Sequence, residues 1–237
     1  MLMGRRGRPL IMSRMAERDW HDWHVLYDDP ESGLSRRLGW VQDRIRVALD
    51  EAPPGPVRAI SLCAGQGRDL IGALSGHPRR CDVTGRLVEL DPRNTAVASR
   101  LAAEAGLGNL EVVTGDASLT SQYADMAPAY LVLVCGVFGN MANADIERTI
   151  GYCTQLCATA GTVVWTRGRW ARGAPDLVPQ VCAWFEERGF DRLWVSDPQH
   201  GQCCGAHRFT GIPGPVEEGA SMFTFTGHDP GTGPARL

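Results

Sequence analysis

Residues 57–69, VRAISLCAGQGRD, decide the fold of this 237-residue chain. The segment 57–63 is mostly apolar, as expected of a buried strand, and a helical stretch over 68–75 follows it. Gly65 and Gly67 lie in the turn between them, where glycine lets the backbone approach a ligand closely. A strand, a glycine-containing turn and a helix in this order predict the first unit of an α/β sheet.

The rest of the chain repeats this alternation. Strands are predicted at 57–63, 85–90, 110–114, 129–136, 161–166 and 192–196, with helices at about 68–75, 92–106, 144–159 and 175–189. Helices of this length between strands predict a mostly parallel sheet that is covered on both faces. No helix is expected after residue 190. There 202–210 and 221–226 are predicted to be strands joined by a Gly- and Pro-rich turn, so the sheet should finish antiparallel.

The N-terminal quarter is different in character. Residues 1–18 are arginine-rich and are expected to be a disordered leader, whereas 19–56 are expected to form a helical cap. Its helix is indicated by apolar residues at helical spacing, namely Leu34, Leu38, Val41, Ile45 and Leu49, and Pro53-Pro54-Gly55-Pro56 ends it. We expect residues 57–237 to form the main domain, with the cap packed on it as a single globular unit.

Composition excludes several classes of protein. Apolar residues make up 43% of the chain, enough for a core, but the longest apolar run, 129–139, is too short to cross a bilayer. A net charge of -3 argues against broad electrostatic binding to nucleic acid. All 24 basic residues are arginine, so no mechanism that needs a lysine is available. Because the sequence shows neither a signal-peptide pattern nor a CxxC pair, we expect a cytoplasmic protein with reduced thiols. Its seven tryptophans are compatible with a homodimer interface.

Acidic residues follow the second and third predicted strands. Glu89 ends the second strand, where a carboxylate can accept hydrogen bonds from ribose hydroxyls. Asp116 follows the third strand, in Gly115-Asp116-Ala117, and can accept from an adenine amino group. Because the carboxyl ends of parallel strands share one edge of a sheet, these acids and the glycine turn together predict a site for an adenosine.

With these three loops the sequence resembles the class I S-adenosylmethionine-dependent methyltransferases, over about residues 57 to 226. The resemblance implies a Rossmann-like, doubly wound, seven-stranded sheet with a reversed final strand, and S-adenosylmethionine as cofactor with S-adenosylhomocysteine as product. It also implies that Glu89 binds the ribose, Asp116 and Ala117 flank the adenine, and Cys135 and Gly136 line the floor below the sulfonium. The full set of expected cofactor residues is Tyr27, Ser61, Cys63, Ala64, Gly65, Gly67, Asp69, Glu89, Leu90, Asp116, Ala117, Cys135 and Gly136.

Two positions depart from the family pattern. The family usually has an acid where this chain has Ser61, and a glycine where it has Cys63, although Asp69 could replace the missing charge. These departures keep open a cofactor-binding relative without catalysis. An NAD enzyme is disfavoured, because its pattern expects a third glycine where this chain has Leu70.

Candidate catalytic residues lie in two places. His24 is a candidate general base in the cap segment, with Tyr27 beside it, unless these side chains only pack the cap onto the sheet. His207 is an alternative base, with Arg208 beside it to recognise an acidic substrate, or else a partly buried strand residue. His200, Cys203, Cys204 and His207 could form a metal site, but adjacent cysteines point to opposite faces of a strand, so no metal is expected.

The loop after the fourth strand indicates the acceptor. Phe138, Asn140 and Met141 suggest an apolar substrate pocket with one amide for orientation. Motifs of nucleobase methylation, Asn/Asp-Pro-Pro-Tyr/Phe in this loop and Pro-Cys, are absent, and residues 127–144 carry no charge for a magnesium-assisted reaction. We expect methyl transfer to a small, fairly apolar molecule, with the acceptor atom (oxygen, nitrogen or carbon) left open. The alternative is a protein or RNA methyltransferase that uses the basic leader for docking.

Overall fold

A seven-stranded sheet is the middle layer of the protein. The structure is a computed structural model that describes residues 19–169 and 176–225. Within these residues the strand order is β3-β2-β1-β4-β5-β7-β6. The strands are β1 (Val57–Leu62), β2 (Val83–Glu89), β3 (Leu110–Thr114), β4 (Ala129–Val134), β5 (Cys157–Gly168), β6 (Phe190–Val195) and β7 (Gln202–Phe209). Strands β1 to β5 are parallel, and β7 runs antiparallel to both β5 and β6. The prediction of a mostly parallel sheet that finishes antiparallel is confirmed.

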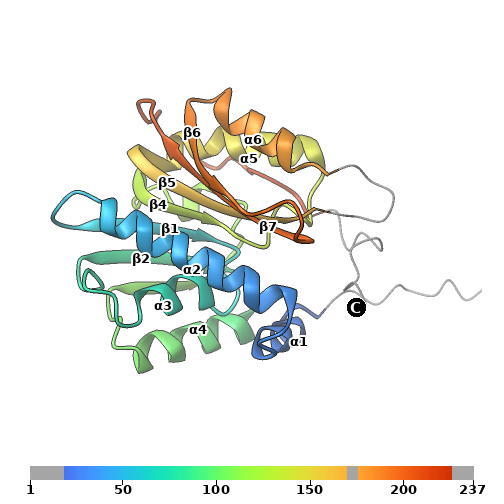
Figure 1. Ribbon diagram of the computed structural model, residues 1–237. Helices are drawn as coiled ribbons and strands as arrows, with labels where there is room; N and C mark the ends of the chain where they lie inside the picture. Colours follow the sequence, from blue (N-terminus) through green and yellow to red (C-terminus); the bar gives the residue numbers. More distant parts are fainter. Residues whose placement is uncertain (1–18, 170–175, 226–237) are drawn as a thin grey trace, which may run out of the picture.

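Helices cover both faces of this sheet (Figure 1). On one face lie α2 (Gly33–Glu51), α3 (Arg68–Leu74) and α4 (Pro92–Glu104), and on the other α5 (Asn143–Leu156) and α6 (Val178–Glu186). Successive residues of β1 point to opposite faces, so Ala59 packs in the cluster under α2 and Ile60 in the cluster under α5. The sheet therefore separates two apolar cores, and its carboxyl edge lies between the two helical layers.

The cap segment consists of α1 (Trp20–Trp23) and η1 (His24–Asp28), which precede α2. It is fastened to the start of α4 by polar contacts. Arg93 bonds Asp19 at 2.9 Å and Asp91 at 2.6 Å, and His21 Nδ1 lies 3.0 Å from Asn94 Oδ1. These contacts hold α1 at the carboxyl edge of the sheet, close to the end of β2.

The C-terminal end of α2 is capped by one arginine from outside the helix. Arg79 donates to the carbonyl oxygens of Leu49, Ala52, Pro53 and Gly55 at 2.7–3.0 Å. Helix ends leave carbonyls without intrahelical partners, and Pro53 prevents the helix from continuing to satisfy them. Arg79 therefore supplies the hydrogen bonds that α2 cannot make itself.

Two predicted elements are wrong in part. The predicted strand 221–226 is not a strand over 221–225: Ser221 and Phe225 form isolated bridges to Leu119 and Met141, and the segment follows loops instead of the sheet. The predicted helix 144–159 ends at Leu156 because Cys157 already pairs with Ala129 as the start of β5. The predicted leader 1–18 and the start of the helix predicted at 175–189 fall outside the described residues.

Among the described residues, every helix is too short or too polar to span a lipid bilayer.

Candidate functional site

The glycine turn after β1 adopts a left-handed backbone at three of its residues. The φ angles are +47° at Cys63, +55° at Gly65 and +69° at Gly67. A side chain at Gly67 would lie 2.7 Å from Ile71 Cδ1 and 2.8 Å from Leu87 Cδ2, so glycine is needed there for α3 to pack on β2. Ser61, at the end of β1, is buried, and Ala64 is partly exposed. The turn thus presents its backbone at the carboxyl edge of the sheet.

Glu89 joins this turn to the end of β2. Its Oε2 accepts a 2.9 Å bond from the N–H of Gly65, and its Oε1 accepts a 2.9 Å bond from the N–H of Asp91. The carboxylate is 9% exposed, whereas the adjacent Leu90 is 68% exposed. An acid held by two backbone donors next to an exposed apolar side chain forms a surface with one polar and one apolar part.

The loop after β3 adds a third acid. Asp116 is exposed, and its Oδ1 accepts from the N–H of Ser118 at 2.9 Å. The carbonyl of buried Ala117 accepts from the Tyr123 hydroxyl at 2.9 Å, which fixes the loop from below. Burial raises the pKa of the Cys63 thiol, and the nearby carboxylates of Glu89 and Asp116 raise it further. The structure therefore brings the three predicted loops together at one edge.

His24 of the cap lies directly over the glycine turn. A Cβ atom added to Gly65 would be 2.4 Å from His24 Nε2, so only glycine lets the imidazole approach this closely. His24 Nδ1 lies 2.6 Å from the carbonyl oxygen of Trp20. Because a carbonyl only accepts, Nδ1 carries the proton in the neutral ring and Nε2 carries the lone pair. Burial lowers the pKa of His24 below its usual 6.5, which favours this neutral form.

Tyr27 belongs to a buried polar network that sequence reasoning did not find as a whole. Its hydroxyl oxygen accepts from Arg37 Nη2 at 2.6 Å, and burial raises the pKa of Tyr27. Burial also raises the pKa of Asp69. The nearby charge of Arg37 and a hydrogen bond from the Cys135 thiol lower this pKa, but by less than burial raises it. The signal for Arg37 was its position on the apolar face of α2, between Leu34 and Val41.

The residues predicted to line the acceptor pocket lie differently. Phe138 and Met141 are buried in the core under α5, and the Phe138 ring packs 6.1 Å from that of Trp165. Asn140 is partly exposed, and its amide donates to the carbonyl of Gly136 at 2.8 Å, so it closes its own loop. The apolar residues Phe138 and Met141 of this loop fill the core. From the sequence alone, an apolar residue that fills the core cannot be told from one that lines a pocket.

His207 is far from this edge, towards the end of β7, where it pairs with Val163 of β5 and Arg192 of β6. It is fully buried, its Nδ1 accepts from Trp165 Nε1 at 3.0 Å, and its ring stacks on Phe185 at 4.6 Å. Burial lowers the pKa of His207 to about 3. Arg208 pairs with Glu51 at the amino side of the sheet, away from the glycine turn. The structure therefore gives His207 no route to a bound acceptor.

The neighbouring cysteines point into different cores. Cys203 packs in the cluster under α5 and Cys204 in the cluster under α2. Within residues 19–169 and 176–225, no three His, Cys, Asp or Glu side chains are grouped in a way that could hold a metal ion.

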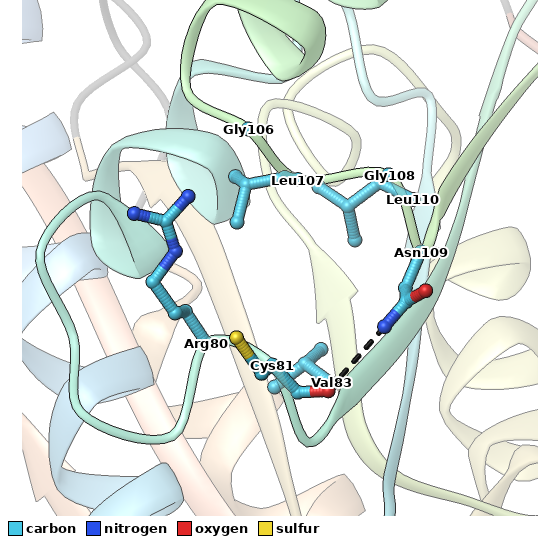
Figure 2. A pocket seen from close by; sticks show the side chains of 8 residues that line it. All are labelled: Arg80, Cys81, Val83, Gly106, Leu107, Gly108, Asn109 and Leu110. Carbon is cyan, nitrogen blue, oxygen red and sulfur yellow. Dashed lines mark hydrogen bonds between the residues drawn. The ribbon is translucent and has the colours of Figure 1, made fainter.

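A pocket of about 150 Å³ lies at the opposite, amino edge of the sheet (Figure 2). It is lined by Arg80, Cys81, Val83 and residues 106–110, and Asn109 Nδ2 donates to the Cys81 carbonyl at 3.3 Å. Because none of the three loops with Gly65, Glu89 and Asp116 reaches it, this pocket is not the candidate site.

Comparisons with known proteins give the fold. No protein-family model matches the sequence, and no curated protein matches it. The structure is similar to an O-methyltransferase family protein from Burkholderia thailandensis, with 16% identity, a TM-score of 0.62, and coverage of 82% of this chain and 59% of that one. An O-methyltransferase family 2 protein from Planctomyces limnophilus DSM 3776 in complex with apigenin gives 15% identity, a TM-score of 0.54, and coverage of 74% and 59%.

A third similar structure is magnesium protoporphyrin IX methyltransferase from Synechocystis PCC 6803 with bound S-adenosylmethionine. Its identity is 13% and its TM-score 0.59, with 79% of this chain and 89% of that chain covered. The first two structures are longer, and this chain matches 59% of their length. The chain has the Rossmann-like fold of the class I S-adenosylmethionine-dependent methyltransferases, as the sequence predicted.

Proposed function

We propose that this protein is an S-adenosylmethionine-dependent methyltransferase that acts on a small, fairly apolar acceptor. The observation that carries the proposal is the hydrogen bond from the Gly65 N–H to Glu89, which unites the glycine turn with the ribose-type acid. Asp116 lies at the next strand end, and together they form the three-part edge that an adenosine requires.

The residues at this edge fit the cofactor. In the proposal Glu89 accepts from the ribose, exposed Leu90 packs on the adenine, and the side chain of Asp116 accepts from its amino group. Gly65 offers a backbone that a ligand can approach closely, beside the His24 ring. When bound, S-adenosylmethionine supplies a methyl group on a positively charged sulfur. The bound cofactor named for the Synechocystis structure supports the same ligand here.

His24 is proposed as the general base. Its Nε2 lone pair faces the glycine turn, its Nδ1–H is fixed by the Trp20 carbonyl, and its lowered pKa keeps the ring neutral. Such a ring can take a proton from an acceptor hydroxyl or amine as the methyl group is transferred. Tyr27, held by Arg37, would then line the same space from the cap.

Calorimetric titration with S-adenosylmethionine and S-adenosylhomocysteine tests the proposal. Micromolar binding, about -8 kcal/mol, is expected for the wild type and should be lost in Glu89→Ala. Glu111→Ala is the matched control, since Glu111 lies on β3 and pairs with Arg86 on the surface. Absence of binding to either ligand would contradict the proposal. Binding without methyl transfer to any of a broad set of acceptors would instead indicate a non-catalytic relative.

The alternative of a protein or RNA acceptor is tested by deleting residues 1–18. On the small-molecule proposal this deletion leaves activity unchanged, because the proposal assigns no role to any residue before Asp19. Loss of activity on deletion would favour a docking arm and a macromolecular acceptor.

A further inference from the structure

Arg167 lies at the carboxyl end of β5, beside the loop that follows β4. In the sheet it pairs with Cys203 of β7. The residue before it, Thr166, accepts a 2.7 Å bond from the N–H of Gly136, which ties β5 to the β4 loop. The Arg167 guanidinium donates from Nη1 to the backbone carbonyl of Phe138. It therefore lies at the same edge of the sheet as the glycine turn, on the side of β4 away from β1.

The charge of Arg167 has no carboxylate partner within the described residues. Two other partly buried arginines have one: Arg86 pairs with Glu111 at 2.8 Å and Arg188 with Glu147 at 2.9 Å. Arg44 and Arg80 have none among the described residues, but neither lies at the carboxyl edge of the sheet: Arg44 lies over the Trp194 ring, and Arg80 precedes β2. The charge of the Asp176 carboxylate raises the pKa of Arg167, but the two side chains form no ion pair. The Asp176 oxygens are taken by Arg169 Nη1 and by the N–H of Val178, each at 2.9 Å.

The adjoining segment does not supply the missing acid, since residues 170–175 contain neither Asp nor Glu. A half-buried guanidinium loses part of its hydration, and burial accordingly lowers the pKa of Arg167. A guanidinium has five N–H donors, and the contact with the Phe138 carbonyl uses one of them. Arg167 thus keeps a donor set of the kind that binds a carboxylate through two parallel bonds.

The loops beside Arg167 leave room for a ligand. Apart from its two chain neighbours, a Cβ atom added at Gly136, Gly139 or Gly168 would meet no described atom within 4 Å. Gly136 and Gly139 belong to the β4 loop whose Phe138 carbonyl holds Arg167, and Gly168 follows Arg167 directly. Open space at Gly136 and Gly139, in the loop that holds the Arg167 guanidinium, is compatible with an anion bound there.

We propose that Arg167 recognises a carboxylate on the acceptor, so that the substrate class is a small organic acid. This inference rests on the proposed function and adds to it the charge of the acceptor. It replaces Arg208, which the sequence suggested for an acidic substrate, because Arg208 pairs with Glu51 at the other side of the sheet. In this role Arg167 determines specificity and takes no part in proton transfer.

The test compares benzoate with benzamide, which has nearly the same shape without the charge. Binding to the wild type is measured by calorimetry or ligand-observed NMR, in the presence of S-adenosylhomocysteine. We expect benzoate to bind at least about tenfold more tightly than benzamide, a factor typical of a charge-assisted pair. Arg167→Gln should abolish this preference, and Arg167→Lys should restore part of it, because lysine keeps the charge but not the two-pronged geometry.

Two controls make the result specific. Arg208→Gln removes an arginine of β7 that lies away from the site and should leave benzoate binding unchanged. The affinity of Arg167→Gln for S-adenosylhomocysteine should equal that of the wild type, which shows that the variant is folded. Absence of benzoate binding, equal binding of benzoate and benzamide, or an unchanged preference in Arg167→Gln overturns the role of Arg167. Failure to bind S-adenosylhomocysteine overturns the proposed function itself.

Discussion

Cys63 adopts a backbone conformation that favours glycine. Its φ of +47° is left-handed, and it stands where the family that the sequence resembles usually has glycine. A Cβ atom in this conformation costs about 1–2 kcal/mol. We therefore expect Cys63→Gly to be more stable than Cys63→Ala by about 1 kcal/mol, as measured by urea unfolding.

The control for this comparison is an ordinary helical position. Ala96 is an exposed residue of α4, and Ala96→Gly should lower the free energy of unfolding by about 1 kcal/mol. If glycine is also the less stable residue at position 63, then the left-handed backbone at Cys63 carries no strain.

The proposed role of His24 as general base determines how activity should depend on pH. Because burial lowers its pKa below 6.5, the base is deprotonated at neutral pH, and kcat/KM should fall only when the pH drops below 6.5. His24→Gln should lower kcat by about 100-fold or more and remove this acidic limb, with little change in affinity for S-adenosylhomocysteine. His21→Gln, in the same segment, is the matched control. Equal kcat values for the two variants would rule out the role of His24 as base.

At the scale of the element, the end of α2 depends on a residue from the next loop. Arg79→Ala removes donors to four carbonyls and the 3.0 Å pair with Asp82. Each hydrogen bond contributes about 0.5–1.5 kcal/mol, and one flexible side chain makes all four of them. Arg79→Ala should therefore lower the free energy of unfolding by about 2–3 kcal/mol. Thermal or urea unfolding measures it.

An exposed arginine provides the comparison for Arg79. Arg100 makes a 3.8 Å pair with Glu104 on the surface of α4, so Arg100→Ala should change stability by less than about 0.5 kcal/mol. A similar small effect for Arg79→Ala would mean that water replaces its hydrogen bonds to the α2 carbonyls.

Local patterns predicted most elements of the fold but not those set by distant contacts. The residues of 221–226, SMFTFT, favoured a strand, yet the segment is held by Ser118, Asp145 and Arg148 instead of a neighbouring strand. Pairing with Ala129 starts β5 at Cys157, and no local signal marks that pairing.

The candidate site shows the same division. Gly65, Glu89 and Asp116 could be predicted because each lies at or just after the end of a strand, and the carboxyl ends of parallel strands meet at one edge. Arg37 could not be placed from the sequence, because its partners Tyr27 and Gln202 come from the cap and from β7. Arg167 depends in the same way on Phe138, which is 29 residues earlier in the chain.

For the whole molecule, burial of His207 predicts a loss of stability in acid. Its pKa is about 3 in the folded protein and near 6.5 when unfolded, so the unfolded state binds the proton first as the pH falls. The stabilisation is complete above pH 6.5 and decreases by about 1.4 kcal/mol per pH unit down to about pH 3. His207→Phe should flatten this slope, even if its stability at pH 7 is lower because Trp165 loses a hydrogen bond.

Stability measured from pH 7 to pH 4 checks this prediction. His200→Gln is the control, since His200 lies at the turn before β7, where its ring contacts Trp40. It should keep the acidic slope of the wild type. Parallel pH profiles for the wild type and His207→Phe would show that His207 does not contribute to acid unfolding.

Because Cys203 and Cys204 point to opposite faces of the sheet, their reactivity can show when each of the two helical layers separates from the sheet. Both thiols are buried, one in each core, whereas Cys81 is exposed and reacts without any opening. Cleavage after arginine leaves Cys203 and Cys204 in a single peptide, 193–208. Timed alkylation followed by fragmentation of that peptide would therefore record, from neighbouring atoms, whether the layer of α2 to α4 and the layer of α5 and α6 separate from the sheet together or one after the other.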